Sequence, residues 1–269
     1  MNRIFIGIAA VASLLTTGAL AADLAPRPYM KAPVMAVYNW TGFYIGGNVG
    51  YSWGSAGNSE TISRSLTGVP LFTNSARNDV NGVIGGGQIG YNWQVTNWLF
   101  GLETDFQGSG ERGSSNFVCL ACADDGTNIT SSLTQKLNWF GTFRGRAGLL
   151  ATPTLLLYAT GGLAYGEVNV SGSVTGNTAQ GIPTTIAIPG NSSTRAGWTA
   201  GAGVEGAIGG NWTAKLEYLY MDLGTVSGGP FALTGILVPA RTTGAVAYSS
   251  HFTDNILRVG VNYKFGGPY

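Results

Sequence analysis

Few residues in this chain of 269 could carry out chemistry, and only one of them is a histidine, His251. A hydroxyl activated by an imidazole, or an imidazole metal ligand, would have to use this side chain. Ser249, Ser250 and Thr253 lie beside it in the sequence, and Asp254 follows. One hypothesis is a His–Ser catalytic pair. The other, which we favour, is that His251 is a polar loop residue.

The two cysteines, Cys119 and Cys122, are separated by two residues. Two cysteines cannot complete a four-ligand zinc site, and no histidine is near them in the sequence. A thioredoxin-like redox motif would need a βαβ context, which the surrounding residues lack. We therefore predict a small loop disulfide that forms during export.

Three glycine motifs match nucleotide-binding or hydrolase patterns. Residues 85–90 and 201–206 both fit G-x-G-x-x-G, and residues 50–54 fit G-x-S-x-G. Both chemistries need a helix directly after the motif, to bind pyrophosphate or to position a nucleophile. No such helix is indicated, and with 43 glycines such matches arise by chance. We predict no cofactor, no metal and no catalytic residue.

Charged residues make up only 10% of the chain, and the formal net charge is +1. Soluble domains usually carry about 25% charged residues. The near-neutral balance argues against nucleic-acid binding, which requires a basic surface. Aromatic residues reach 11%, which argues against intrinsic disorder. Much of the surface is therefore expected to contact something other than water.

The N-terminus has the pattern of a secretory signal peptide. A positive start at Arg3 precedes the apolar residues 4–15, and Ala19 and Ala21 fit a small-x-small cleavage site. We predict a signal peptide over residues 1–21, cleaved after Ala21, and a periplasmic segment over 22–39. No later apolar run is long enough for a transmembrane helix, so a membrane-spanning product would have to be a closed β-barrel.

Apolar and polar residues alternate along most of the remaining chain, which indicates β-strands. One face is apolar and ends in Trp, Tyr or Phe, as membrane-boundary girdles require. Nearly all charges lie on the other face, which is rich in Gly, Asn and Thr; Glu167 and Asp222 are the exceptions. A soluble barrel would show the reverse arrangement. The predicted strands cover residues 41–54, 82–93, 98–108, 135–149, 155–167, 198–208, 212–223 and 255–265.

The connections between these strands alternate between short and long. The short ones are 94–97, 151–154 and 209–211, and the long ones lie near 55–79, 109–133, 170–195 and 224–254. This alternation is typical of outer-membrane barrels, with short periplasmic turns and long outer loops. We predict an all-β, eight-stranded antiparallel up-and-down transmembrane barrel over residues 40–265, with four long extracellular loops and a short tail over 266–269.

The predicted barrel is narrow, so its inward side chains should fill it. We predict acid–base pairs across the lumen, because unpaired charges in a narrow, water-poor interior are costly. The alternative is that these charges line a solvated channel. Bulky inward residues Ile84, Phe140, Leu219 and Met221 favour a plugged lumen. The predicted charge network comprises Glu103, Asp105, Arg144, Arg146, Glu205, Lys215, Glu217 and Arg258.

Three segments, 39–47, 215–218 and 257–265, resemble the small outer-membrane β-barrel proteins of alphaproteobacteria. That family is called the outer-membrane immunogenic protein or porin family, within the OmpA-like barrel superfamily. The resemblance covers essentially the whole mature chain and implies the cell outer membrane of a Gram-negative bacterium. The last strand also resembles the signal read by the outer-membrane assembly machinery, through Arg258, Gly260, Tyr263 and Phe265. The chain departs from the family by continuing past Phe265.

The function expected from these observations is that of a structural, surface-exposed antigen, not an enzyme. Its loops would make the interactions, and its lumen would be largely plugged. A narrow or gated porin is the second hypothesis. A lipid A-modifying barrel enzyme, which would use His251 at the outer rim, is the third. Expected partners are outer-membrane lipid and lipopolysaccharide, the assembly machinery, periplasmic chaperones and external surface ligands, but no nucleic acid.

Overall fold

The structure is a computed structural model that describes residues 38–64, 68–119, 128–177, 182–233 and 244–266. The predicted signal peptide, its cleavage after Ala21, most of the segment 22–39 and the tail beyond Gly266 lie outside these residues. No helix within the described ranges is long and apolar enough to span a bilayer.

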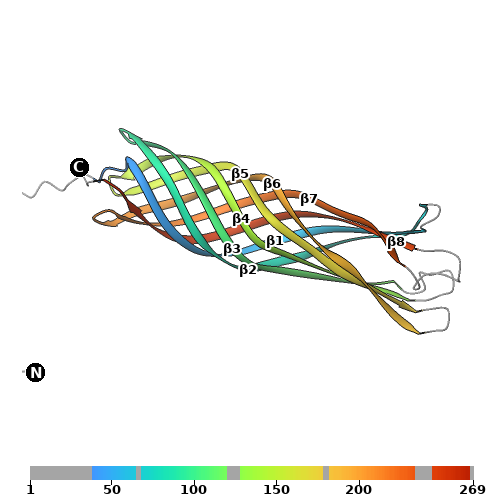
Figure 1. The fold of residues 1–269 in the computed structure, drawn as a ribbon. Helices are drawn as coiled ribbons and strands as arrows, with labels where there is room; N and C mark the ends of the chain where they lie inside the picture. The colour runs from blue at the N-terminus through green and yellow to red at the C-terminus, as the bar shows by residue number, and fades with distance from the viewer. Residues whose placement is uncertain (1–37, 65–67, 120–127, 178–181, 234–243, 267–269) are drawn as a thin grey trace, which may run out of the picture. The chain divides into compact units, whose positions relative to one another are not determined.

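Eight antiparallel strands form a closed barrel in which each strand pairs with its sequence neighbours and the last pairs with the first (Figure 1). This confirms the predicted fold class. The strands are β1 (Gly42–Arg64), β2 (Pro70–Val95), β3 (Trp98–Cys119), β4 (Ile129–Thr152), β5 (Leu155–Asn177), β6 (Pro183–Gly209), β7 (Trp212–Leu233) and β8 (Gly244–Lys264).

The two faces of the barrel wall follow the alternation in the sequence. Apolar side chains point outwards and are open to the surroundings, as Phe43 on β1 and Leu163 on β5 illustrate with exposed fractions of 60% and 63%. Charged side chains point inwards, and Arg144 on β4 is fully buried. An apolar exterior around a charged interior suits a barrel surrounded by lipid.

Short turns join the strands at one end, as the sequence predicts. The β2–β3 turn contains Thr96 at a φ of 56°, and the β6–β7 turn contains Gly210 at a φ of 53°. Both values lie in the left-handed region that tight turns often require. Thr96 accepts this conformation although it has a branched side chain, and the Gln94 side-chain amide donates a hydrogen bond to its carbonyl oxygen at 3.0 Å.

The four long connections predicted as loops are in large part strand, and this corrects the sequence prediction. β1, for example, continues ten residues past the predicted end at Gly54, to Arg64. The Ser, Thr, Asn and Gly content of these segments suggested loops, but their inward positions repeat apolar residues, as in Val168, Val170 and Val174. The long connections are therefore tall hairpins, and only their tips lie outside the strands.

Two of the eight strand pairings stop near the outer aromatic rim. β2–β3 pairing ends at Asn81↔Arg112 and β6–β7 pairing ends at Trp198↔Asp222, whereas the other six continue to the hairpins. Above that level the described strands divide into two four-stranded sheets, β7-β8-β1-β2 and β3-β4-β5-β6. In Figure 1 the teal outer end of β2 and the gold outer end of β6 point apart.

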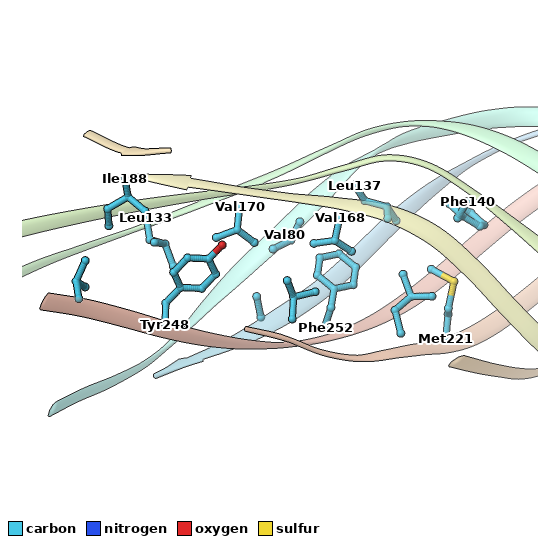
Figure 2. Close-up of a cluster of buried hydrophobic side chains, with 14 of the residues drawn as sticks. Val80, Leu133, Leu137, Phe140, Val168, Val170, Ile188, Met221, Tyr248 and Phe252 are labelled. Carbon is cyan, nitrogen blue, oxygen red and sulfur yellow. The ribbon is translucent and has the colours of Figure 1, made fainter. Parts of the chain in front are cut away.

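Apolar side chains from both sheets fill the space between them. Figure 2 shows Val168 and Val170 of β5 facing the rings of Phe252 and Tyr248 of β8. These four residues are at most 3% exposed. Two packed sheets with an apolar interior form a β-sandwich, so the outer part of the molecule has a core of its own.

Candidate functional site

The eight predicted lumen charges lie on the inward faces of β3, β4, β6, β7 and β8, and the structure brings them into one connected network. Glu103 is its centre. This carboxylate lies 2.5 Å from Arg144 Nη2, 2.9 Å from Lys215 Nζ, and 3.6 Å from both Arg146 Nη1 and Arg258 Nη2. All five side chains are at most 4% exposed.

Asp105 and Glu217 connect the same two arginines from opposite sides. Asp105 Oδ2 accepts hydrogen bonds of 2.9 Å from Arg144 and from Arg258. Glu217 accepts one of 3.1 Å from Arg144 Nη1 and one of 2.7 Å from Arg258 Nε. Several donors of each guanidinium are therefore bound to carboxylates, the geometry in which arginine pairs are strongest.

Glu205 links Arg146, the remaining arginine of the network, to polar side chains in the periplasmic half of the lumen. Its Oε2 atom lies 2.5 Å from Arg146 Nη2. Its Oε1 atom accepts hydrogen bonds from Thr213 at 2.6 Å and from Asn262 at 2.9 Å. Both carboxylate oxygens are thus occupied by buried donors.

Two tyrosines extend this network, and each lies over a glycine. Tyr44 donates a hydrogen bond of 2.7 Å to Glu103, and Tyr158 donates one of 3.0 Å to Glu217. A Cβ atom at Gly203 would meet the Tyr158 ring at 2.6 Å, and one at Gly90 would overlap the Tyr44 ring. These glycines are needed because the rings occupy the space that a side chain would take.

The network contains four acids and four bases, so its formal charge is zero. Burying a charge in a protein is favourable only when partners and hydrogen bonds compensate for lost hydration. Removing one member leaves an opposite charge buried without compensation. The arrangement is therefore suited to closing the lumen rather than to lining a wide aqueous path.

A second buried acidic group lies above the network, and the sequence analysis did not single it out as a pair. Glu111 and Asp254 are next to each other and at most 1% exposed. Ser109 donates a hydrogen bond of 3.1 Å to Glu111, and Ser52 donates one to Asp254. The sequence pattern places Glu111 in a loop and Asp254 next to His251. Only the strand register of the closed barrel shows that the two carboxyl groups are neighbours.

The periplasmic mouth is closed by Trp40, a residue that the sequence analysis also missed. Its backbone N–H donates a hydrogen bond of 2.9 Å to Gln94, and its indole N–H donates one of 3.1 Å to the Pro153 carbonyl oxygen. The ring is 1% exposed and packs with Tyr38, Leu99, Leu156 and Tyr158. Burial, and to a lesser extent the charge of Glu205, raises the pKa of Tyr38 to about 12.

Strand alternation separates His251 from Ser250 and Asp254, whereas Ser249 and Thr253 share its outward face without forming a hydrogen bond to its ring among the described contacts. His251 points out of the barrel and is half exposed, whereas Ser250 and Asp254 point into it and are at most 1% exposed. The imidazole instead lies 3.6 Å from Asp222 and 3.1 Å from the hydroxyl of Thr225. The His–Ser pair considered above is therefore not assembled.

The residues of the predicted assembly signal have two different environments. Arg258 belongs to the charge network, and Gly260 lies on the same inward face of β8. Tyr263 and Phe265 face outwards at the periplasmic rim, where Tyr263 packs edge-to-face against Phe265 at 5.5 Å and against Trp212 at 5.1 Å.

The remaining sequence motifs contribute no site. The two G-x-G-x-x-G segments lie within β2 and β6, and residues 50–54 lie within β1. Within the described residues, His, Cys, Asp and Glu side chains form no metal-binding group of three or more. Cys119 ends β3 and Cys122 lies outside the described ranges, so the disulfide stays a prediction.

Comparison with known proteins agrees with this architecture. The family model described as "Outer membrane protein beta-barrel domain" matches residues 7–265. The 31 kDa outer-membrane immunogenic protein of Brucella melitensis is 37% identical, over 96% of this chain and 98% of its own length. The 22 kDa outer membrane protein of Rhizobium leguminosarum is 30% identical, over 87% of this chain and 82% of its own length.

Among solved structures, the outer membrane protein OprG of Pseudomonas aeruginosa aligns with a TM-score of 0.43 and 12% identity, over 84% of this chain and 98% of OprG. The family assignment comes from the match of the family model and from the two relatives at 30% identity or more. The chain belongs to the outer membrane protein β-barrel family and is an integral protein of the cell outer membrane.

Proposed function

We propose that this protein is a closed membrane support that holds a rigid two-sheet structure above the cell surface. The observation that carries the proposal is the continuous filling of the barrel interior. The cluster around Trp40 closes the periplasmic mouth, the neutral charge network fills the membrane section, and an apolar core fills the outer section. Such an interior supports a structural role better than a transport role.

The hairpin tips are the proposed region of interaction. Tips held on a rigid scaffold are where binding residues are usually found. The Brucella relative is named an immunogenic protein, which supports recognition of an exposed surface by antibodies. We therefore assign surface recognition, including antigenicity, to the outer sheets and their tips.

Shortening the four hairpins tests this assignment. Each hairpin is cut to a short turn at the level of the outer aromatic rim, so that the charge network and the periplasmic mouth are retained. Antibodies raised against the folded protein in vesicles should bind cells carrying the intact chain and lose most binding to cells carrying the shortened one. Unchanged binding to a folded shortened barrel would contradict the proposal.

We also propose that the protein is not an enzyme. Thr225, His251 and Asp222 are the residues that most resemble a catalytic group, but they lie on the outer surface of the barrel wall with His251 half exposed. A catalytic triad needs a site that holds the substrate against the nucleophile. His251→Ala should leave the mass profile of lipid A unchanged in cells, and an altered profile would contradict this part of the proposal.

The last strand is proposed to carry the assembly signal, and lipopolysaccharide is proposed as a neighbour of the outer rim. The Tyr263 and Phe265 rings point away from the barrel and would be available to the assembly machinery before the barrel closes. Phe265→Ala should lower the amount of folded protein in the outer membrane, whereas the exposed apolar substitution Val261→Ala, on the same face of β8, should lower it much less.

A further inference from the structure

A small enclosed cavity lies where β2 and β3 separate, between the edges of the two outer sheets. Its volume is about 20 Å³. A cavity of ~10–15 Å³ is the minimum for one water molecule, so this one has room for a single water or a bare ion. Polar residues that line it are Asn58, Glu60, Asn74, Ser115, Asn116 and Ser131, of which Asn116 is exposed on the outward face of β3.

The cavity contains one carboxylate, Glu60, which is 8% exposed. Both of its oxygens accept a hydrogen bond from the same hydroxyl, Ser131 Oγ, at 2.8 Å. Among the side chains that the structure describes, no lysine or arginine lies within ion-pair distance of it.

Next to this carboxylate, in the same sandwich, lies a group of buried amides whose hydrogen bonds are satisfied by one another. Asn58, Asn78 and Gln135 form a ring of hydrogen bonds, and Gln135 also donates one of 3.2 Å to Ser250. Every amide in that ring is matched by another side chain. Among the described side chains, Glu60 has a single hydroxyl donor instead, and none of them supplies a positive charge to its carboxylate.

Every polar side chain around the cavity other than Glu60 is neutral and carries an oxygen. Carboxylate, amide and hydroxyl oxygens are the ligands of hard cations, whereas nitrogen and sulfur ligands, which softer metals prefer, are absent from the cavity lining. Calcium accepts such irregular oxygen sets more readily than magnesium, which requires near-octahedral geometry. The donor set therefore selects a hard cation with flexible coordination.

The ligands come from both sheets. Glu60 belongs to β1 and Asn74 to β2, whereas Ser115 belongs to β3 and Ser131 to β4. Within the described residues, backbone pairing between β2 and β3 has already ended at this height. A stacked pair, Phe72 on β2 and Phe117 on β3, crosses the same opening at 4.8 Å.

We propose that this cavity binds one hard cation of the calcium type, which links the two outer sheets where their hydrogen-bond ladder is interrupted. The carboxylate supplies the charge, and the amide and hydroxyl oxygens complete the coordination. With a single carboxylate the affinity should be weak, about 0.1–1 mM, as in extracellular calcium sites. The site is in the outer section, and solvent outside the cell can supply the ion.

The test uses the full mature chain, refolded without lipopolysaccharide in a zwitterionic detergent and treated with a chelator. Calcium is then added while thermal unfolding is followed, and titration calorimetry counts the bound ions. Calcium should raise the melting temperature and bind at one ion per chain, with magnesium less effective. Glu60→Gln should abolish both effects, whereas the matched variant Glu167→Gln, at the outer rim, should keep them.

An equal calcium shift in Glu60→Gln and in the unaltered chain would overturn the proposal, and so would the absence of binding in the unaltered chain. If Glu60→Gln does not fold, Asn74→Ala provides the second variant, because Asn74 lines the cavity and is only partly buried, so its replacement should weaken calcium binding while leaving the barrel intact. Wild-type affinity in Asn74→Ala and in Ser115→Ala would also count against the site.

Discussion

At the scale of single residues, Glu103 has more influence on the lumen than any of its neighbours. It contacts all four bases of the charge network, and among the described residues it is the only ion-pair partner of Lys215. The strand alternation alone predicts that these eight side chains point inwards. It cannot predict that one carboxylate reaches four bases, because that depends on the shear of the closed barrel.

Replacing Glu103 with glutamine should therefore destabilise the barrel strongly. The change removes the carboxylate that lies within ion-pair distance of Lys215, and breaking a buried pair in this way typically costs about 3–5 kcal/mol. The free energy of unfolding in urea, measured in lipid vesicles, checks this. The control Glu167→Gln should lose much less stability, because it removes only hydrogen bonds at an accessible rim.

A second substitution separates charge from packing. Lys215→Met in the Glu103→Gln background should restore part of the lost stability, because the uncompensated positive charge is removed. Purely additive losses in the double variant would mean that the two side chains act independently. In that case the network would not be the coupled unit described here.

Glu60 should make the outer section sensitive to pH. Because burial raises the pKa of Glu60 above the ordinary value of 4.5, the folded chain holds this proton more tightly than the unfolded chain does. The free energy of unfolding should therefore fall as the pH rises from 4.5 through the folded pKa.

Glu60→Gln should lack that dependence when a chelator is present. It should be more stable than the unaltered chain at neutral pH and about equally stable below pH ~3, where the Glu60 carboxyl is protonated in both the folded and the unfolded chain. Unfolding titrations at a series of pH values measure the difference. An unaltered chain that becomes more stable than Glu60→Gln as the pH rises would contradict the assigned direction.

At the scale of elements, the strands could be located from the sequence and their ends could not. Turns such as the one containing Gly210 have glycine in their sequence, and the apolar outward faces are long enough for each strand to be recognised from its alternation. Above the membrane the outward positions become polar, so the alternation reverses its sense. The polar outward residues of segments such as 168–174 therefore suggest a loop, and only the inward valines indicate a strand.

The division into two sheets has a direct consequence for backbone hydrogen exchange. Upper residues of β2, β3, β6 and β7 have a strand neighbour on one side only, whereas β1 and β8 have neighbours on both sides to the hairpin tips. Amides of residues 71–79 and 224–232 should exchange faster than those of 55–63 and 245–253 at the same height. Uniform protection around all eight strands would contradict the division.

The contribution of Trp40 can be tested separately, because this residue closes the periplasmic mouth but precedes β1 and belongs to no strand. Trp40→Ala should lower the free energy of unfolding by about 3–5 kcal/mol, the usual loss for a buried large aromatic. It should not open a conducting path, because the charge network above it is unchanged. Conductance appearing in this variant would mean that Trp40, rather than the network, seals the lumen.

At the scale of the whole molecule, three successive layers make the interior continuous: an aromatic cluster, a neutral ionic network and an apolar core. The barrel class follows from the sign of the alternation, and the orientation in the membrane follows from the short and long connections. The order of the three layers could not be predicted in this way. Whether residues such as Trp40, Glu111 and Phe252 point inwards is known only from the closed barrel.

Single-channel conductance of the folded mature chain in a planar bilayer tests the closed lumen most directly. Folding is checked beforehand by the heat-dependent shift in gel mobility, so that the lack of current from an unfolded preparation is not mistaken for a closed lumen. A folded, inserted protein should give no current steps, since the charged section is filled and neutral. Reproducible steps whose size changes in Arg144→Gln or Glu103→Gln would contradict the account, because they would show ions passing through the network itself.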